Sequence, residues 1–301
     1  MENMKEEILN FYKKTSIYTN YANYKNYFRS LPDDLKELTK LINDSYIHRI
    51  VLLKSYITHD RISEEYPWYD YRCHDDILLT APAIMAELFR LDERGLIHGR
   101  EHKNKVIITC RYASVLLASI LKAKGIPTRV RSGFAPYINQ NRYPDHWICQ
   151  YYSEREERWI NIDTDEIEIE RKHYNNIDVK DEYFCFAAEA WLNVRGGKVN
   201  VEKFVHGSSI KGLDMLARTL FFDFHALMND EISYLFFPTY LDTSKEFFEL
   251  GIEELKELDD LALLMLEPDK NFDELRYLFE NDKKFRVLNT PLLGDKDHLE
   301  I

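Results

Sequence analysis

The chain has 301 residues, of which 45% are hydrophobic and 31% charged, and its formal net charge is −12 at pH 7. This length allows one large domain or two ordinary domains with a sizeable core. The acidic balance disfavours a nucleic-acid-binding surface and docking on an anionic membrane, because both require a basic face. With only 10 Gly and 9 Pro, collagen-like and low-complexity disordered chains are excluded.

The sequence favours a cytoplasmic protein with reduced thiols. No apolar run approaches the roughly 20 residues that span a bilayer. The polar start of the chain, residues 1–7, lacks the apolar core of a secretory signal. Four cysteines are too few for a disulfide framework in a chain of this length, and no two have Cys-x-x-Cys spacing. These cysteines are Cys73, Cys110, Cys149 and Cys185.

The first quarter of the chain is predicted to be helical. The sequence Pro32-Asp33-Asp34 opens a helix whose leucines and isoleucine, over residues 35–42, recur at steps of three and four. Residues 46–57 continue an apolar pattern, and we expect a second helix there. Residues 77–89 predict a further helix, in which Pro82 is a possible interruption.

The middle of the chain changes from helical to strand-like periodicity. Residues 109–124 carry one apolar stripe and predict a strong helix, which Gly125 ends. Strand-like runs follow at residues 128–134, 146–152 and 158–163, and a polar turn of hairpin length separates the last two. The middle therefore predicts one helix followed by an antiparallel meander.

Helices are predicted to return in the last third of the chain. One is capped at residues 208–209 and runs to about residue 228, and others lie over residues 243–266 and 272–279. The tail after residue 288 is polar. The fold class that these patterns favour is α+β, with the helix over residues 109–124 packed on an antiparallel sheet and helices flanking this core. The expected regions are an N-terminal helical region over 1–75, a core over 76–185 and a C-terminal helical region over 186–301, with one compact unit as the alternative.

One group of residues in the middle of the chain indicates chemistry. Cys110 stands at the start of the predicted helix, where the helix dipole and nearby amide groups lower the pKa of a thiol. A thiolate nucleophile also needs a proton acceptor and a group that orients this acceptor. His146 begins one predicted strand and Asp163 ends the next. In a hairpin the start of the first strand lies opposite the end of the second, so the two residues would be cross-strand neighbours. The three residues would then form a Cys–His–Asp arrangement.

The sequence around these residues resembles the transglutaminase-like superfamily of cysteine enzymes. In residues 110–129 a Cys opens a helix of small and apolar residues that ends in Gly125-Ile126-Pro127, as in that family. Asp145-His146-Trp147 is similar to the family's His block, and residues 159–163 are similar to its Asp block. The resemblance covers roughly residues 75–170, and three blocks in the right order make it fairly specific.

This resemblance implies a papain-like enzyme with Cys110 as nucleophile, His146 as base and Asp163 as orienting group. Its substrate would be an amide in a peptide, a protein or a small molecule, attacked to form a thioester at Cys110. Water as the second reactant gives hydrolysis and an amine gives acyl transfer, and both stay open. The backbone N–H of Cys110 and a second, unidentified donor would hold the oxyanion. No cofactor or metal is implied.

Three positions depart from the family pattern. Ile108 stands where many members have Gly, Thr164 stands where many have Pro, and Trp147 adjoins His146 where the Trp is more often two positions on. These positions shape the rim of the active site, so the substrate class does not transfer from the family. Because the superfamily includes members that have lost activity, an inactive binding or scaffold protein is the alternative.

The remaining candidate residues favour structural roles. Cys149 lies three residues from His146 and is expected to face the other side of its strand, in the core, and Cys185 lies in an apolar run. Cys73 and His74 invite a metal-site interpretation, but neighbouring residues of an extended segment point to opposite faces. We therefore expect no metal site there. Two polar residues of the late helical region, Asp223 and His225, are expected mainly on a solvated face, and the alternative is that they line one wall of the cleft.

Overall fold

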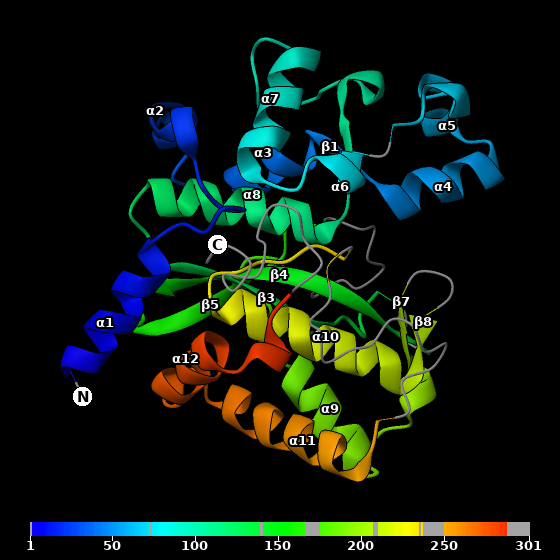
Figure 1. The fold of residues 1–301 in the computed structure, drawn as a ribbon. Helices are drawn as coiled ribbons and strands as arrows, with labels where there is room; N and C mark the ends of the chain where they lie inside the picture. The colour runs from blue at the N-terminus through cyan, green and yellow to red at the C-terminus, as the bar shows by residue number, and fades with distance from the viewer. Residues whose placement is uncertain are drawn as a thin grey trace, which may run out of the picture. The chain divides into compact units, whose positions relative to one another are not determined.

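The computed structural model describes residues 2–72, 74–138, 141–165, 175–206, 210–234, 236 and 250–287 (Figure 1). The chain divides into two compact units, each built from segments that are far apart in the sequence. The Cys110 unit comprises residues 9–130 and 147–179, and the C-terminal unit comprises residues 1–8, 131–146 and 180–301. Among the described residues, no helix is long and apolar enough to cross a bilayer.

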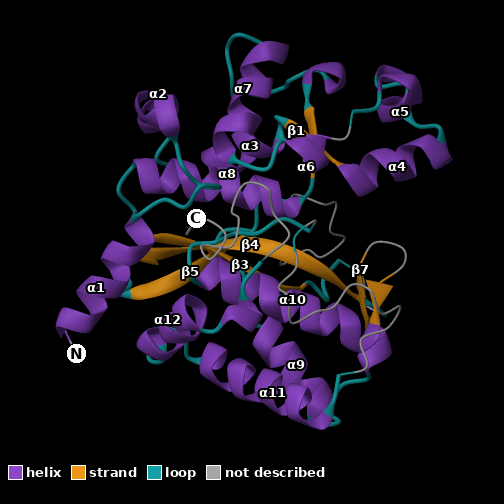
Figure 2. Ribbon diagram, in the orientation of Figure 1, coloured by secondary structure: helices purple, strands orange, loops and turns teal. Residues whose placement is uncertain are grey.

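Both units contain more helix than strand among the described residues (Figure 2). Helix α1, Glu2–Lys13, contributes to both units. The Cys110 unit contains α2 (Lys25–Ser30), α3 (Leu35–Asn43), α4 (Arg49–Thr58), α5 (Arg61–Glu65), α6 (His74–Ile77), α7 (Ala81–Leu91) and α8 (Cys110–Ala123). The C-terminal unit contains α9 (Ala187–Arg195), α10 (Gly212–Leu227), α11 (Ile252–Leu266) and α12 (Phe272–Asn281).

The main sheet has the strand order β6-β3-β4-β7-β8, with β5 pairing on β4. Three of its pairs, β3–β6, β4–β5 and β7–β8, are antiparallel, whereas β7 runs parallel to β4. The strands are β3 (Thr128–Phe134), β4 (Tyr143–Ser153), β5 (Arg158–Ile162), β6 (Cys185–Phe186), β7 (Phe204–His206) and β8 (Ile210–Lys211). The β4–β5 pair confirms the predicted hairpin, because its ladder runs from Ser153 opposite Arg158 to Cys149 opposite Ile162.

Helix α8 packs on this hairpin within the Cys110 unit. The hydroxyl of Ser114 donates a 3.1 Å hydrogen bond to the carbonyl of Trp147, and the thiol of Cys149 donates a 3.0 Å bond to the carbonyl of Ser114. Every residue of α8 is buried. Gly125 has a φ of +84°, which favours glycine, and ends the helix as predicted. The predicted helix on an antiparallel sheet is confirmed, as is the core position of Cys149.

The predicted helix over residues 46–57 is wrong in its first three residues. Tyr46–His48 form strand β1, which pairs in parallel with β2 (Val106–Ile108), and α4 begins only at Arg49. Residues 46–48 form a strand because their backbone pairs with β2, which is far away in the sequence. The apolar pattern of residues 46–57 does not indicate this pairing. The side chain of His48 accepts from the amide N–H of Ile50 at 3.2 Å and so caps α4.

The expected solvated positions of Asp223 and His225 are also wrong, because both residues are buried in α10. Two guanidinium nitrogens of Arg131 each lie 2.8 Å from the Asp223 carboxylate, and Nδ1 of His225 lies 2.8 Å from Asp230. Helix α10 is buried nearly all round, so its polar side chains must find partners inside the unit. Cys73, the start of the predicted helix over 243–266 and the tail after residue 288 lie outside the described residues.

Candidate active site

Cys110 is the first residue of α8 and only 4% of its surface is exposed. Strand β2 leads into the helix through Thr109, so the thiol sits where a buried strand turns into a buried helix. The amide N–H groups of a first helical turn and the helix dipole favour a negative charge at this point. The sequence-based placement of Cys110 at a helix start is confirmed.

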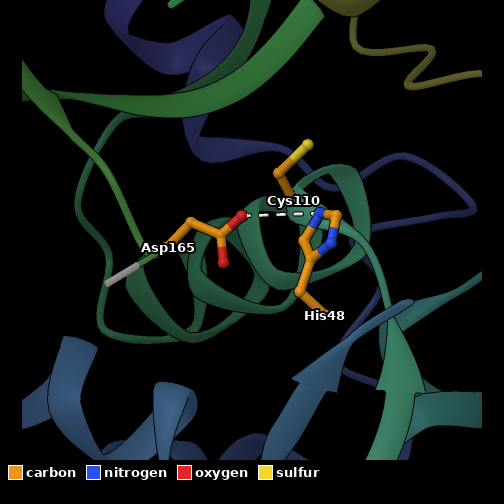
Figure 3. Close-up of side chains that lie close together, drawn as sticks. All are labelled: His48, Cys110 and Asp165. Atoms are coloured by element: carbon orange, nitrogen blue, oxygen red, sulfur yellow. Dashed lines mark ion pairs between the residues drawn. The ribbon is translucent and has the colours of Figure 1, made fainter. Parts of the chain in front are cut away.

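Two other side chains gather around the thiol. The Cys110 sulfur, a ring nitrogen of His48 and a carboxylate oxygen of Asp165 all lie within 4.8 Å of one another. Nε2 of His48 is 3.6 Å from Oδ2 of Asp165. In Figure 3 the carboxylate of Asp165, from the segment after β5, faces the ring of His48 at the end of β1, and Cys110 at the start of α8 lies beside them. All three belong to the Cys110 unit.

Strand pairing brings His48 to the cluster. In the parallel β1–β2 pair, His48 lies opposite Ile108, and Cys110 follows two residues later. Asp165 arrives from the other side, shortly after β5 ends at Ile162. Sequence reasoning missed both His48 and Asp165. The signals that could have revealed them are the strand-compatible run Tyr46-Ile47-His48 and the acidic residue that follows Thr164.

Tyr46 holds the carboxylate of Asp165 in place. Its hydroxyl donates to Oδ1 of Asp165 at 2.6 Å and to the carbonyl of Thr164 at 3.3 Å. Burial raises the pKa of Tyr46 well above its ordinary value, and the negative charges of Asp165, Asp163 and Cys110 raise this pKa further. Tyr46 therefore remains a hydrogen-bond donor, and these three groups share one electrostatic environment.

Asp163, the predicted orienting residue, lies directly after β5 and is completely buried. One of its carboxylate oxygens accepts a 2.9 Å hydrogen bond from the amide of Asp165. Its backbone is fixed to Asn176, whose carbonyl accepts from the amide of Asp163 at 2.9 Å. These bonds shape the turn that delivers both carboxylates to the neighbourhood of Tyr46.

His146, the predicted base, lies in β4 and is 1% exposed. Its imidazole has edge-on neighbours in the rings of Tyr137, at 6.1 Å, and Phe184, at 6.4 Å between centroids. His146 belongs to the C-terminal unit and Cys110 to the other unit. The partnership between these two residues stays a prediction, as does the orienting role of Asp163.

Several polar atoms of this region have no hydrogen-bond partner among the described residues. They are Oδ2 of Asp165 and the hydroxyls of its neighbour Thr164 and of Thr109, which precedes Cys110. Buried polar atoms in proteins are nearly always paired with protein, water or a ligand. The surroundings of Cys110 therefore offer hydrogen-bonding capacity to a polar molecule.

Cysteine, histidine and aspartate are also the side chains that bind zinc, and catalytic zinc sites use three protein ligands. The tautomer of His48 does not fit this use. Its Nδ1 accepts a hydrogen bond from the amide of Ile50, so the proton of the neutral ring is on Nε2, the nitrogen that faces Asp165. A zinc-binding imidazole has the reverse arrangement, with its N–H pointing away from the ligating nitrogen. The hydrogen bonding favours proton chemistry over metal binding.

No protein-family profile, no curated protein and no solved structure matches this chain. The site is therefore defined by the positions and chemistry of its own residues. They establish an α+β fold in which a buried Cys–His–Asp group stands at the start of a helix packed on an antiparallel hairpin.

Proposed function

We propose that the protein is a cysteine-dependent enzyme that acts on an amide bond, with Cys110 as its nucleophile. One observation carries this proposal: the Cys110 sulfur begins a buried helix and lies within 4.8 Å of an imidazole nitrogen and a carboxylate oxygen. Thiol, imidazole and carboxylate are the groups that nucleophilic acyl transfer uses. The resemblance of residues 110–129 to transglutaminase-like enzymes supports the same reaction class.

We assign the role of proton acceptor to His146, oriented by Asp163. His48, whose ring lies within 4.8 Å of the sulfur and whose Nδ1 accepts from the amide of Ile50, is the second candidate for this role. The carboxylates of Asp163 and Asp165 oppose a further negative charge on Cys110, so the thiol needs an acceptor that becomes positively charged. An imidazolium at His146 would meet this need.

In the proposed reaction the thiolate of Cys110 attacks the amide carbonyl carbon, and the carbonyl π electrons move to the oxygen. The resulting oxyanion collapses, the C–N bond breaks, and the leaving amine takes a proton from the imidazolium. A thioester remains on Cys110. Water or an amine then attacks the thioester carbonyl and gives a proton to the imidazole, the C–S bond breaks to release the acid or the new amide, and the thiolate–imidazolium pair is restored. Water yields hydrolysis, and an amine yields acyl transfer.

Alkylation of Cys110 as a function of pH tests the proposal. A limiting dose of iodoacetamide is applied to the native protein, and mass spectrometry measures the label on each cysteine. We expect the Cys110 labelling rate to have its midpoint well below pH 8. In His146→Ala the midpoint should rise toward about 8.5, the value of an ordinary thiol, and in Asp163→Ala it should rise less. His74→Gln, which changes a buried imidazole on α6, is the matched control.

Three results would contradict the proposal in different ways. Superimposable curves for wild type and His146→Ala would remove His146 as the base. Labelling of Cys149 or Cys185 before Cys110 would remove Cys110 as the nucleophile, since Cys149 is buried and burial raises the pKa of Cys185. Absence of Cys110 labelling until the protein unfolds would favour the inactive binding or scaffold protein.

A further inference from the structure

We propose that helix α4 of one copy of the chain docks into a groove between α11 and α12 of a second copy. The proposal rests on two exposed surfaces of the protein, an apolar face of α4 and an apolar groove with an acidic rim. Each surface lies within a single unit of the chain. The first is convex and basic and the second is concave and acidic, so a second copy offers each surface a matching partner.

Helix α4 exposes apolar side chains on the face that points away from its own core. On the inner face, Leu52 is buried and belongs to the same core cluster as Ile47. Ile50, Leu53 and Ile57 follow one another at steps of three and four, so they share the outer face. They are 53%, 45% and 80% exposed. Large apolar side chains that gather on one exposed face indicate a contact surface.

The charge that α4 carries on this face is positive. Lys54 lies four residues after Ile50, which places it on the same face. Residues 49–58 contain two basic residues and no acidic one. Arg49 pairs with Asp75, whereas Lys54 is exposed and forms no ion pair with another described residue. A partner for this face should therefore combine apolar and acidic side chains.

A groove with this combination lies between α11 and α12, which pack against each other in the C-terminal unit (Figure 1). The groove is open to solvent, has a volume of about 390 Å³ and exposes an almost wholly apolar surface. Its apolar side chains are Leu264, Tyr277 and Leu278, and Asp273 and Glu274 also line it. The apolar anchors of a helix, spaced three and four residues apart, insert into grooves of this kind.

The rim of the groove is acidic and lacks counter-charges. Residues 252–281 contain ten Asp or Glu and three Lys or Arg. The guanidinium of Arg276, on the same helix as the rim, pairs with Glu280 at 2.8 Å. Asp273 and Glu274 are exposed, and neither forms an ion pair within the described part of the chain. The basic face of α4 would neutralise this rim while its apolar side chains fill the groove.

Other occupants fit the groove less well. An open groove cannot surround most of a small molecule, as pockets for such ligands do. The acidic rim would repel an anionic membrane. The outer face of α4 is both apolar and basic, and every solution of the protein contains it. One helix in one groove is a small interface, so we expect weak, concentration-dependent association. Because the two surfaces differ, the contact is head-to-tail and either closes into a ring or continues as a filament.

Sedimentation equilibrium of the full chain over a range of concentrations tests the proposal. The weight-average mass of wild type should rise above the monomer mass of 36.0 kDa as the concentration increases. Lys54→Glu and Ile57→Ser should each weaken self-association by about tenfold. Lys36→Glu, on an exposed part of α3, and Ile252→Ser, at the start of α11, are the matched controls and should associate like wild type. Equal urea midpoints confirm that the variants are folded.

A mixing experiment determines whether α4 and the groove meet between two molecules. Glu274→Lys should weaken self-association as Lys54→Glu does, because each variant places like charges at the contact. A mixture of the two variants should associate again, since the basic α4 of one variant meets the acidic groove of the other. If a charge reversal impairs folding, Lys54→Gln and Glu274→Gln serve in the same way, because each variant keeps one of the two wild-type surfaces.

A wild-type mass that stays at 36.0 kDa at every concentration would overturn the proposal. Folded Lys54→Glu or Glu274→Lys proteins that associate as strongly as wild type would also overturn it, since another surface would then form the contact. A mixture that associates no better than the separate variants would show that the two charges do not meet. None of these results bears on the proposed function, because the substituted residues lie outside the Cys110 cluster.

Discussion

The hydroxyl of Tyr46 lies 2.6 Å from Oδ1 of Asp165, and this hydrogen bond joins β1 to the segment after β5. Both side chains are buried, at 4% and 3% exposure, so the bond forms away from solvent. Hydrogen bonds to an ionised acceptor are stronger than neutral ones, and a buried carboxylate that loses its donor keeps the full cost of desolvation. Tyr46 therefore sets the position of Asp165, and Asp165 in turn faces His48.

We expect Tyr46→Phe to lower the free energy of unfolding by about 1–3 kcal/mol, because it leaves Oδ1 of Asp165 without this donor. Urea denaturation measures the change. Tyr69→Phe is the matched control, since Tyr69 is 71% exposed, and it should change the free energy by less than about 0.5 kcal/mol. Equal stabilities of the two variants would show that the Tyr46–Asp165 bond contributes nothing.

Asp165→Asn should make Cys110 more reactive at neutral pH. The substitution keeps the size of the side chain and removes a negative charge close to the sulfur, so the pKa of the thiol should fall. The pH dependence of iodoacetamide labelling measures this shift. Asp33→Asn, whose side chain is 96% exposed, is the control and should leave the curve unchanged. A shift to higher pH would instead identify Asp165 as the partner of a cationic histidine.

His74 should make the folded protein sensitive to mild acid. Burial, and to a lesser extent the charge of Arg72, lower the pKa of His74 from 6.5 to about 4, although Glu87 opposes the shift. As the pH falls, His74 therefore becomes protonated near pH 6.5 in the unfolded chain but only near pH 4 in the native protein. Stability contributed by neutral His74 is complete above pH 6.5 and is lost on acidification, by about 3 kcal/mol at pH 4.

His74→Gln provides the comparison for this pH dependence. The amide oxygen of Gln can accept from the amide of Ile107, as Nδ1 of His74 does at 2.9 Å, and it does not titrate. Urea unfolding between pH 7 and pH 4 should show wild type losing more stability than the variant as the pH falls. Parallel curves for the two proteins would contradict the assignment to His74.

Gly133→Ala should destabilise the sheet where β3 pairs with β6. Gly133 lies opposite Phe186, and a Cβ at this position would collide with the backbone carbonyl of Cys185 and the ring of Phe184. Because backbone cannot move aside cheaply, we expect a loss of about 1–3 kcal/mol in the free energy of unfolding. Gly251→Ala is the control, since its nearest contact would be an ordinary 3.5 Å. If Gly133→Ala and Gly251→Ala changed the urea midpoint equally, the backbone of β6 would be able to move aside at little energetic cost.

The helix and the hairpin around Cys110 could be predicted because their signals are local. The predicted strand over residues 128–134 agrees with β3, and the run over 158–163 agrees with β5 to within one residue. Helix α8 begins at Cys110 as expected and gives way at Gly125. The signals for these elements are the helical and strand periodicities, the terminal glycine and the polar turn. Each depends on only a few neighbouring residues, so it can be recognised in a single sequence.

The partners of Cys110 depend on contacts between distant parts of the chain. His48 reaches the thiol because β1 pairs in parallel with β2, and Asp165 reaches it because Tyr46 binds the turn after β5. The run Tyr46-Ile47-His48 has the same apolar pattern as the helix that follows it, and only the ladder offered by β2 makes it a strand. The sequence alone thus determined the position of Cys110 at the start of its helix. The tertiary structure decided which imidazole and which carboxylate lie near Cys110. These residues are brought there by the parallel β1–β2 pair and by a buried hydrogen bond, which join segments far apart in the sequence and therefore leave no local pattern.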